Sequence, residues 1–88
     1  MKRARVVVSG SVQGVFFRTE TRDRARSLGV AGWIRNVPDG TVEAVFEGED
    51  ERVGSMVDWC RRGPLGAGVE DVEVEWVEPE DEVGFSIR

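Results

Sequence analysis

Histidine is absent from this 88-residue sequence, and cysteine occurs only once, at Cys60. The lack of histidine excludes phosphohistidine intermediates, Ser-His-Asp triads and histidine-ligated zinc. A single cysteine excludes an internal disulfide, which fits a reducing compartment. The apolar run behind the basic N-terminus is only Val6-Val7-Val8, far shorter than a signal-peptide core or a membrane span. We therefore expect a cytoplasmic protein that does not bind a membrane.

Motifs for covalent catalysis on phosphorus are also missing. A Cys-x5-Arg phosphatase built on Cys60 would need arginine at position 66, where Gly66 stands. An Asp-x-Asp-Gly-Thr nucleophile would need aspartate at position 37, where Val37 stands. No Walker-type Gly-Lys-Ser/Thr segment occurs, and no tight carboxylate cluster indicates magnesium. A phosphoryl site in this chain would therefore work by positioning water and neutralising charge, with no metal and no cofactor.

The net charge of −5 hides two halves of opposite sign. Residues 1–36 carry eight Lys and Arg against two acids, and residues 37–88 carry four Arg against fifteen acids. We interpret the acidic half as a solvated surface. In the basic half, arginines flank a glycine-rich loop and the turn after Asn36, which favours an anion site there. A chain of this length is expected to form one domain over residues 1–88, with a single core.

Hydrophobic periodicity and turn residues predict the order β-α-β-β-α-β with a short C-terminal strand. Strands are expected over residues 3–9, 31–37, 41–47, 72–76 and 84–88, and helices over residues 17–28 and 49–62. Pro38-Asp39-Gly40 predicts a hairpin turn between the second and third strands. The order is typical of an α+β, ferredoxin-like split βαβ sandwich. This fold would be an antiparallel sheet of four to five strands with two helices on one face.

The third strand alternates between apolar and mainly polar residues, so we expect one buried face and one mostly exposed face. Its two acids, Glu43 and Glu47, fall on the face expected to be exposed. The three Trp, four Phe and many Val are expected to supply the core. Cys60 belongs to the apolar stripe of the second helix, so we interpret it as a packed thiol and not a reactive one.

The run from Gly10 to Arg18, Gly-Ser-Val-Gln-Gly-Val-Phe-Phe-Arg, joins the first strand to the first helix. Its two glycines let the backbone approach a ligand closely, and the helix N-terminus adds unpaired N–H donors. Arg18 adds a planar fork of donors suited to phosphate oxygens. The loop therefore predicts an anion site. Because the chain shows no general acid, a leaving group that departs as an anion suits this site, as in mixed carboxylic-phosphoric anhydrides.

Two segments resemble the signatures of the acylphosphatase family. The first is Gly10 to Arg18, and the second is Gly32 to Glu43, Gly-Trp-Ile-Arg-Asn-Val-Pro-Asp-Gly-Thr-Val-Glu. The similarity extends over nearly the whole chain, including Arg62-Gly63-Pro64 after the second helix. The resemblance implies hydrolysis of acyl phosphates to a carboxylate and inorganic phosphate on a ferredoxin-like fold, with neither metal nor phosphoenzyme.

The same resemblance implies the residues of the site. Arg18 and the loop amides would hold the phosphoryl oxygens, and the side chain of Asn36 would orient the attacking water. The implied phosphate-binding residues are Val12, Gln13, Gly14, Val15, Phe16, Phe17 and Arg18. The side-chain amide of Gln13 is expected to pin the loop. Thr19-Glu20-Thr21 stands where the family often has an aromatic or other large residue, so we expect this stretch to alter the rim of the site.

Two alternative functions remain open from the residues. The fold class also contains RNA-recognition domains, and Gly14-Val15-Phe16-Phe17 resembles an aromatic RNA-reading strand. Against this, those aromatics lie at a loop-to-helix junction, and the net charge is acidic. A non-catalytic anion-binding module would keep the loop without turnover. We expect a monomer whose partner is a small-molecule acyl phosphate and not a nucleic acid.

Overall fold

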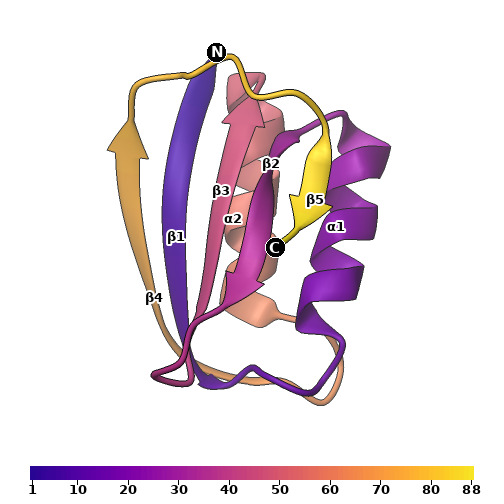
Figure 1. Ribbon diagram of the computed structural model, residues 1–88, viewed down its shortest axis with the longest axis vertical. Coiled ribbons are helices and arrows are strands. Elements are labelled where there is room, and N and C mark those ends of the chain that lie inside the picture. The colour runs from indigo at the N-terminus through magenta and orange to yellow at the C-terminus, as the bar shows by residue number, and fades with distance from the viewer.

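The computed structural model describes residues 1–88 as a five-stranded sheet with two helices. The elements in chain order are β1 (Lys2–Ser11), α1 (Phe17–Leu28), β2 (Ala31–Asn36), β3 (Val42–Gly48), α2 (Asp50–Arg62), β4 (Gly68–Val77) and β5 (Phe85–Ile87). The strands lie in the order β4-β1-β3-β2-β5, and both helices pack on the same face of the sheet (Figure 1). This is the ferredoxin-like α+β sandwich that the sequence predicts. Neither helix has the length and apolar character needed to cross a membrane.

The sheet is mixed, which differs in one strand from the antiparallel sheet expected from the sequence. The first four strands pair antiparallel, but β5 runs parallel to β2, with Gly32 opposite Phe85. The reason is the path of residues 78–84, which leave β4 at one edge and cross the top of the sheet to the other edge, where β2 begins (Figure 1). A strand that is entered from that end has to run in the same direction as β2.

The core lies between the sheet and the two helices. α1 contributes Phe17, Thr21 and Ala25, and α2 contributes an apolar stripe that includes Cys60. Burial raises the pKa of the Cys60 thiol to about 12, so the thiol stays protonated, as its interpretation as a packed residue requires. Trp59 is also buried, and its Nε1 donates to Thr21 Oγ1 at 2.9 Å.

The aromatic residues divide between core and surface, which corrects the expectation that all of them supply the core. Trp33 is partly exposed, and the Arg88 guanidinium carbon lies 4.6 Å from the centroid of its ring. Trp76 is 53% exposed on the edge strand β4, where Lys2 Nζ lies 5.1 Å from the centroid of its ring. Phe16 is 77% exposed in the loop before α1.

β3 is buried on both faces, so the expectation of a mostly exposed acidic face is wrong. Glu43, Val45 and Glu47 are only 5%, 3% and 3% exposed. Arg5 Nε from β1 and Arg35 Nε from β2 donate to the two carboxylate oxygens of Glu43 at 2.6 and 2.7 Å. Burial acts to raise the pKa of Glu43, but the two guanidinium groups outweigh it and hold that pKa below its ordinary value. Charge pairing thus covers the sheet face that the helices leave open.

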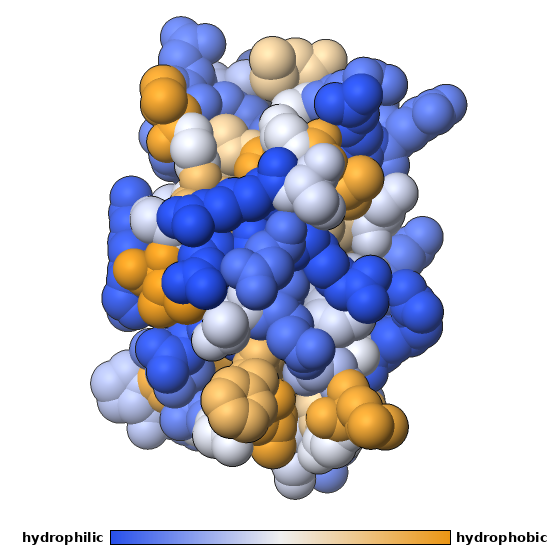
Figure 2. Space-filling model, turned by 90° about the vertical axis from the view of Figure 1, so that its right-hand side faces the viewer, coloured by the Kyte–Doolittle hydropathy of each residue, from blue (hydrophilic) through white to orange (hydrophobic).

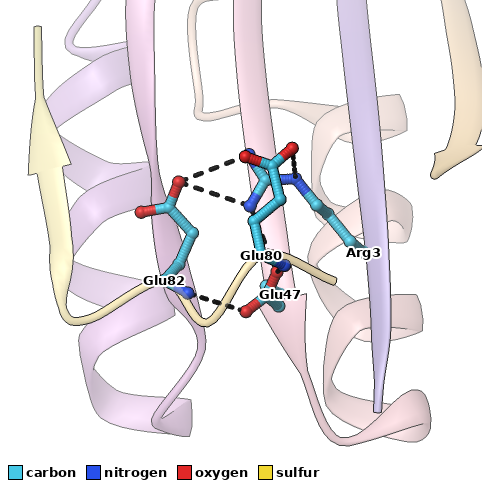
Figure 3. Close-up of polar contacts among 4 residues, drawn as sticks. All are labelled: Arg3, Glu47, Glu80 and Glu82. Atoms are coloured by element: carbon cyan, nitrogen blue, oxygen red, sulfur yellow. Dashed lines mark hydrogen bonds and ion pairs between the residues drawn. The ribbon is translucent and has the colours of Figure 1, made fainter. Parts of the chain in front are cut away.

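Residues 78–84 are fastened to the sheet by Glu47 (Figure 3). The backbone N–H groups of Glu80 and Glu82 donate to its Oε1 and Oε2 atoms at 2.7 and 2.8 Å. Arg3, which is 6% exposed, donates to Glu47 Oε1 at 3.1 Å and to Glu82 Oε1 at 3.3 Å. One buried carboxylate therefore holds the crossing segment that delivers β5 to the far edge.

Candidate active site

A hollow of about 280 Å³ lies where β1 leads into α1, beside the end of β2. It is lined by Val12, Gly14, Phe16, Phe17, Arg18, Thr19 and Asn36. Six of these are among the eight residues that the sequence analysis assigned to the site. Of the other two, Gln13 turns toward the β2–β3 hairpin and Val15 packs against the core. The fold thus brings the loop and Asn36 to one place.

The backbone of the β1–α1 loop depends on glycine at two positions. Gly10 has a φ of 121°, and a Cβ atom there would lie 2.1 Å from the carbonyl oxygen of Gly68, where the pairing of β1 with β4 shifts register. Gly14 has a φ of 77°. Side chains are strained in both conformations, so glycine sets the path of the loop, as expected from the sequence.

The backbone donors of this loop are unpaired. None of the N–H groups from Gln13 to Thr19 donates a hydrogen bond within the protein, and the first bond of α1 runs from the Glu20 N–H to the Phe16 carbonyl at 3.0 Å. The first N–H groups of a helix have no partner inside the helix, and they carry the positive end of its dipole. The loop adds its own donors to them, so the hollow is suited to an anion.

Arg18 supplies the positive charge of the hollow. It lies in the first turn of α1, is partly buried, and makes no ion pair and no side-chain hydrogen bond within the protein. Arg5 and Arg35, in contrast, are both paired with Glu43. An unpaired guanidinium beside unpaired N–H groups matches the oxygens of a phosphoryl group.

Asn36 brings an amide side chain to the hollow from the last position of β2. Its Oδ1 atom is buried and has no hydrogen-bond partner. No other buried side-chain nitrogen or oxygen of the structure lacks a hydrogen-bond partner. Buried polar atoms are nearly always paired, so an unpaired amide oxygen in a hollow is typical of a group that serves a ligand or a water.

Gln13 ties the loop to the hairpin that follows Asn36. Its Nε2 donates to the carbonyl oxygens of Val37 at 2.8 Å and Thr41 at 2.9 Å. Inside the turn, the hydroxyl and the N–H of Thr41 donate to Asp39 Oδ1 and lower the pKa of that carboxyl. This bridge fixes the loop relative to the end of β2, which is the pinning role expected for Gln13.

Thr19 is the one lining residue that the sequence does not predict as part of the site. Of the polar stretch Thr19-Glu20-Thr21, only Thr19 reaches the hollow, because Glu20 is exposed and Thr21 is buried beside Trp59. A helix N-terminus presents its whole first turn to an anion, and that signal includes the position after Arg18. The polar stretch therefore contributes a single residue, Thr19, to the hollow.

The lining residues include one cation and no carboxylate, imidazole or thiol. The structure also has no group of three or more His, Cys, Asp or Glu side chains placed to hold a metal ion. The hollow can therefore bind and polarise an anion through hydrogen bonds and charge. With the split βαβ fold, this defines the class of the chain: a ferredoxin-like protein with a hollow suited to an anion at its β1–α1 loop.

The family model for acylphosphatase matches residues 4–87, and the chain belongs to the acylphosphatase family. It is 59% identical to an acylphosphatase of Anaeromyxobacter dehalogenans over 98% of this chain and 94% of the relative. The crystal structure of the Bacillus subtilis acylphosphatase is 35% identical, with a TM-score of 0.95 over 100% of this chain and 99% of that chain. An acylphosphatase structure from Coxiella burnetii is 39% identical, with a TM-score of 0.94 over 99% and 92%. The chain is accordingly an enzyme that hydrolyses acyl phosphates.

Proposed function

We propose that the hollow binds the phosphoryl group of an acyl phosphate and that Asn36 orients a water for direct attack on phosphorus. The observation that carries this proposal is the meeting of three unpaired groups at one hollow. These are the N–H donors of the loop, the guanidinium of Arg18 and the Oδ1 atom of Asn36. The N–H donors and the guanidinium bind the anion, and the amide oxygen binds a water beside it.

The phosphoryl group sits among the N–H groups of the loop from Val12 to Phe17, with Arg18 against its equatorial oxygens. Phosphoryl transfer passes through a loose transition state in which charge is spread over those oxygens. Donors that are already in place stabilise this charge without reorganising, and removing one such donor slows a reaction by roughly 10²- to 10³-fold. Positioning and electrostatics therefore supply the catalysis.

The attacking water donates a hydrogen bond to Asn36 Oδ1, which directs an oxygen lone pair toward phosphorus. A bond forms between the water oxygen and phosphorus as the bond from phosphorus to the bridging oxygen breaks. The electron pair of the broken bond leaves with the carboxylate. Both water protons remain on the phosphate product, which is released as dihydrogen phosphate and ionises in solution. No side chain of the hollow has to accept a proton.

The leaving group limits the substrates of this site. A carboxylate departs as a stable anion, whereas an alkoxide needs a proton from a general acid. Arg18 is the only ionisable side chain of the hollow, and a guanidinium does not release a proton near neutral pH. Acyl phosphates are therefore turned over, and simple alkyl phosphate monoesters are not.

The structure favours a small-molecule partner over RNA. RNA-recognition domains of this fold class stack bases on exposed aromatic side chains of the central strands. Here the open face of β1 and β3 is covered by ion pairs of Glu43 and Glu47 with arginines. Phe17 is buried, and Phe16 lies in the loop.

Steady-state hydrolysis of benzoyl phosphate in EDTA, with inorganic phosphate as competitive inhibitor, tests the proposal. Arg18→Ala is expected to lower kcat/KM on the order of 10³-fold and to abolish phosphate inhibition, because the seat loses its only cation. Asn36→Ala is expected to lower kcat by about 10²- to 10³-fold and to keep phosphate inhibition. Arg22→Ala removes a helix arginine that pairs with Asp23 outside the hollow, and this matched control should keep wild-type rates.

Three results would count against the proposal. Near-normal turnover by Asn36→Ala would remove the water-orienting role. Loss of activity in EDTA would show that a metal is required and would contradict catalysis by the loop and Arg18 alone. Binding of a labelled RNA oligonucleotide without hydrolysis of benzoyl phosphate would favour the RNA-binding alternative.

A further inference from the structure

An exposed phenylalanine stands at the hollow. Phe16 lines it together with Arg18 and Asn36, yet 77% of the residue is open to solvent. Its neighbour Phe17 is 1% exposed and belongs to the core. An aromatic ring left in water forgoes the stabilisation that burial gives. Packing therefore does not explain a phenylalanine at position 16.

The backbone does not call for phenylalanine at this position either. Phe16 has a φ of 60° and a ψ of 19°, in the left-handed region. Glycine and asparagine adopt this region readily, whereas a residue with a bulky side chain is strained there. Asp81 is the only other non-glycine residue with positive φ. Phe16 is thus the one exposed large apolar side chain that stands at positive φ, and strained residues of this kind concentrate at ligand sites.

The Phe16 ring lies beside the proposed phosphoryl-binding loop, where the acyl group of a bound substrate could contact it. If the loop and Arg18 hold the phosphoryl group, the acyl group has to project from the seat toward the open side of the hollow. Another exposed apolar residue, Leu65, lies in the α2–β4 connection at the same end of the molecule (Figure 1). Figure 2 shows apolar atoms at that end, below a band of hydrophilic side chains, and further apolar atoms near the opposite end.

We infer that the ring of Phe16 contacts the acyl group and makes the enzyme favour acyl phosphates with an aromatic or branched apolar acyl group over acetyl or carbamoyl phosphate. This inference rests on the proposed function, because the acyl group reaches Phe16 only when the phosphoryl group occupies the loop. An aromatic ring packs well against another ring or a branched chain and gains little from a single methyl group. Phe16 is thus a specificity residue, since it does not act on phosphorus.

The test is the ratio of kcat/KM for benzoyl phosphate to kcat/KM for acetyl phosphate. Phe16→Asn removes the ring but keeps a residue that tolerates the left-handed backbone. It is expected to lower the ratio about three- to tenfold, because the benzoyl phosphate rate falls more than the acetyl phosphate rate when the ring is removed. Phe16→Trp keeps an aromatic surface and should hold the ratio within about twofold of wild type. Val83→Ala, an exposed apolar residue of the segment between β4 and β5 and outside the hollow, is the matched control and should leave both rates unchanged.

The outcomes separate this inference from the function on which it rests. An unchanged ratio in Phe16→Asn, with wild-type hydrolysis of both substrates, would overturn the role of Phe16 and leave the proposed function standing. An equal fall for both substrates, with weaker phosphate inhibition, would show that Phe16 shapes the loop and would also overturn it. Failure of the wild-type enzyme to hydrolyse either substrate would overturn the proposed function itself.

Discussion

Replacing Glu47 by leucine is expected to destabilise the protein strongly, although Glu47 lies on the sheet face that carries no helix. Its carboxylate accepts hydrogen bonds from the backbone N–H groups of Glu80 and Glu82 and from the Arg3 guanidinium (Figure 3). Leucine fills a similar volume and accepts none of these bonds. The substitution leaves two N–H groups of the crossing segment unpaired, and it removes the closest anion from a guanidinium that is only 6% exposed.

The magnitude follows from these contacts. Removing one partner of a buried ion pair costs about 3–5 kcal/mol when the remaining charge is left uncompensated. Arg3 keeps Glu82 at 3.3 Å and the more exposed Glu80 at 3.7 Å, so about 3 kcal/mol is expected. A chain of this length has a free energy of unfolding of about 4–13 kcal/mol, so the loss is a large share of it. It corresponds to a fall in Tm of about 12–24 °C.

Urea unfolding followed by far-UV circular dichroism measures this change, provided that the m-value stays constant. Glu80→Gln is the control, because its carboxylate is exposed and its contact with Arg3 is long; it should change the free energy of unfolding by less than about 0.5 kcal/mol. Arg3→Met combined with Glu47→Leu removes both charges and should be more stable than Glu47→Leu alone. A Glu47→Leu protein that loses no more stability than the control would refute the reasoning.

Two further outcomes are expected. Gln13→Ala removes the bridge to the carbonyls of Val37 and Thr41 and should lower kcat/KM for benzoyl phosphate about tenfold, with about 1 kcal/mol lost in unfolding free energy. An unchanged rate would show that the loop and the hairpin keep their places without this bridge. Acid should also destabilise the protein, since hydrogen bonds and guanidinium groups overcome burial and keep the pKa values of Glu43 and Glu47 below the ordinary glutamate range. This contribution to the free energy of unfolding is complete above the pKa that glutamate has in the unfolded chain. It is lost as the pH falls from about 5 through the lower pKa values of the folded protein. A free energy of unfolding, measured in urea, that stays constant down to about pH 3 would contradict this prediction.

The elements and the candidate site could be predicted because their signals are local. The buried stripe of α1 and the turn from Pro38 to Gly40 act on residues nearby in the sequence. A glycine-rich loop before a helix offers unpaired N–H donors to an anion, and this property depends only on residues nearby in the sequence. Asn36 is different, since a lone asparagine before a turn is usually a turn residue. It was found only through the resemblance of its whole segment to a family signature.

The burial of Glu43 and Glu47 could not be predicted from alternation along β3. That pattern separates polar from apolar side chains, whereas a paired carboxylate can be as buried as a valine. The partners of Glu47 lie 44 and 33 residues away, at Arg3 and Glu80. The parallel direction of β5 could not be predicted for the same reason. It depends on the path of residues 78–84, which Glu47 holds through contacts between residues far apart in the sequence. The acceptors of Gln13 are backbone carbonyls, which no side-chain pattern reveals.

Arg18 remains unpaired because of its neighbours on the helix. Residues three and four positions away on a helix are the ones that meet its side chain. For Arg18 the positions on α1 are Thr21 and Arg22, and the residues three and four positions before it, Val15 and Gly14, lie in the loop; none of the four is an acid. Glu20 is only two positions away, on another face of α1, and does not pair with it. On the sheet the opposite holds, since both acids of β3 are paired with arginines. In a protein of net charge −5, this local gap in the acids leaves the Arg18 guanidinium at the hollow without an acidic partner.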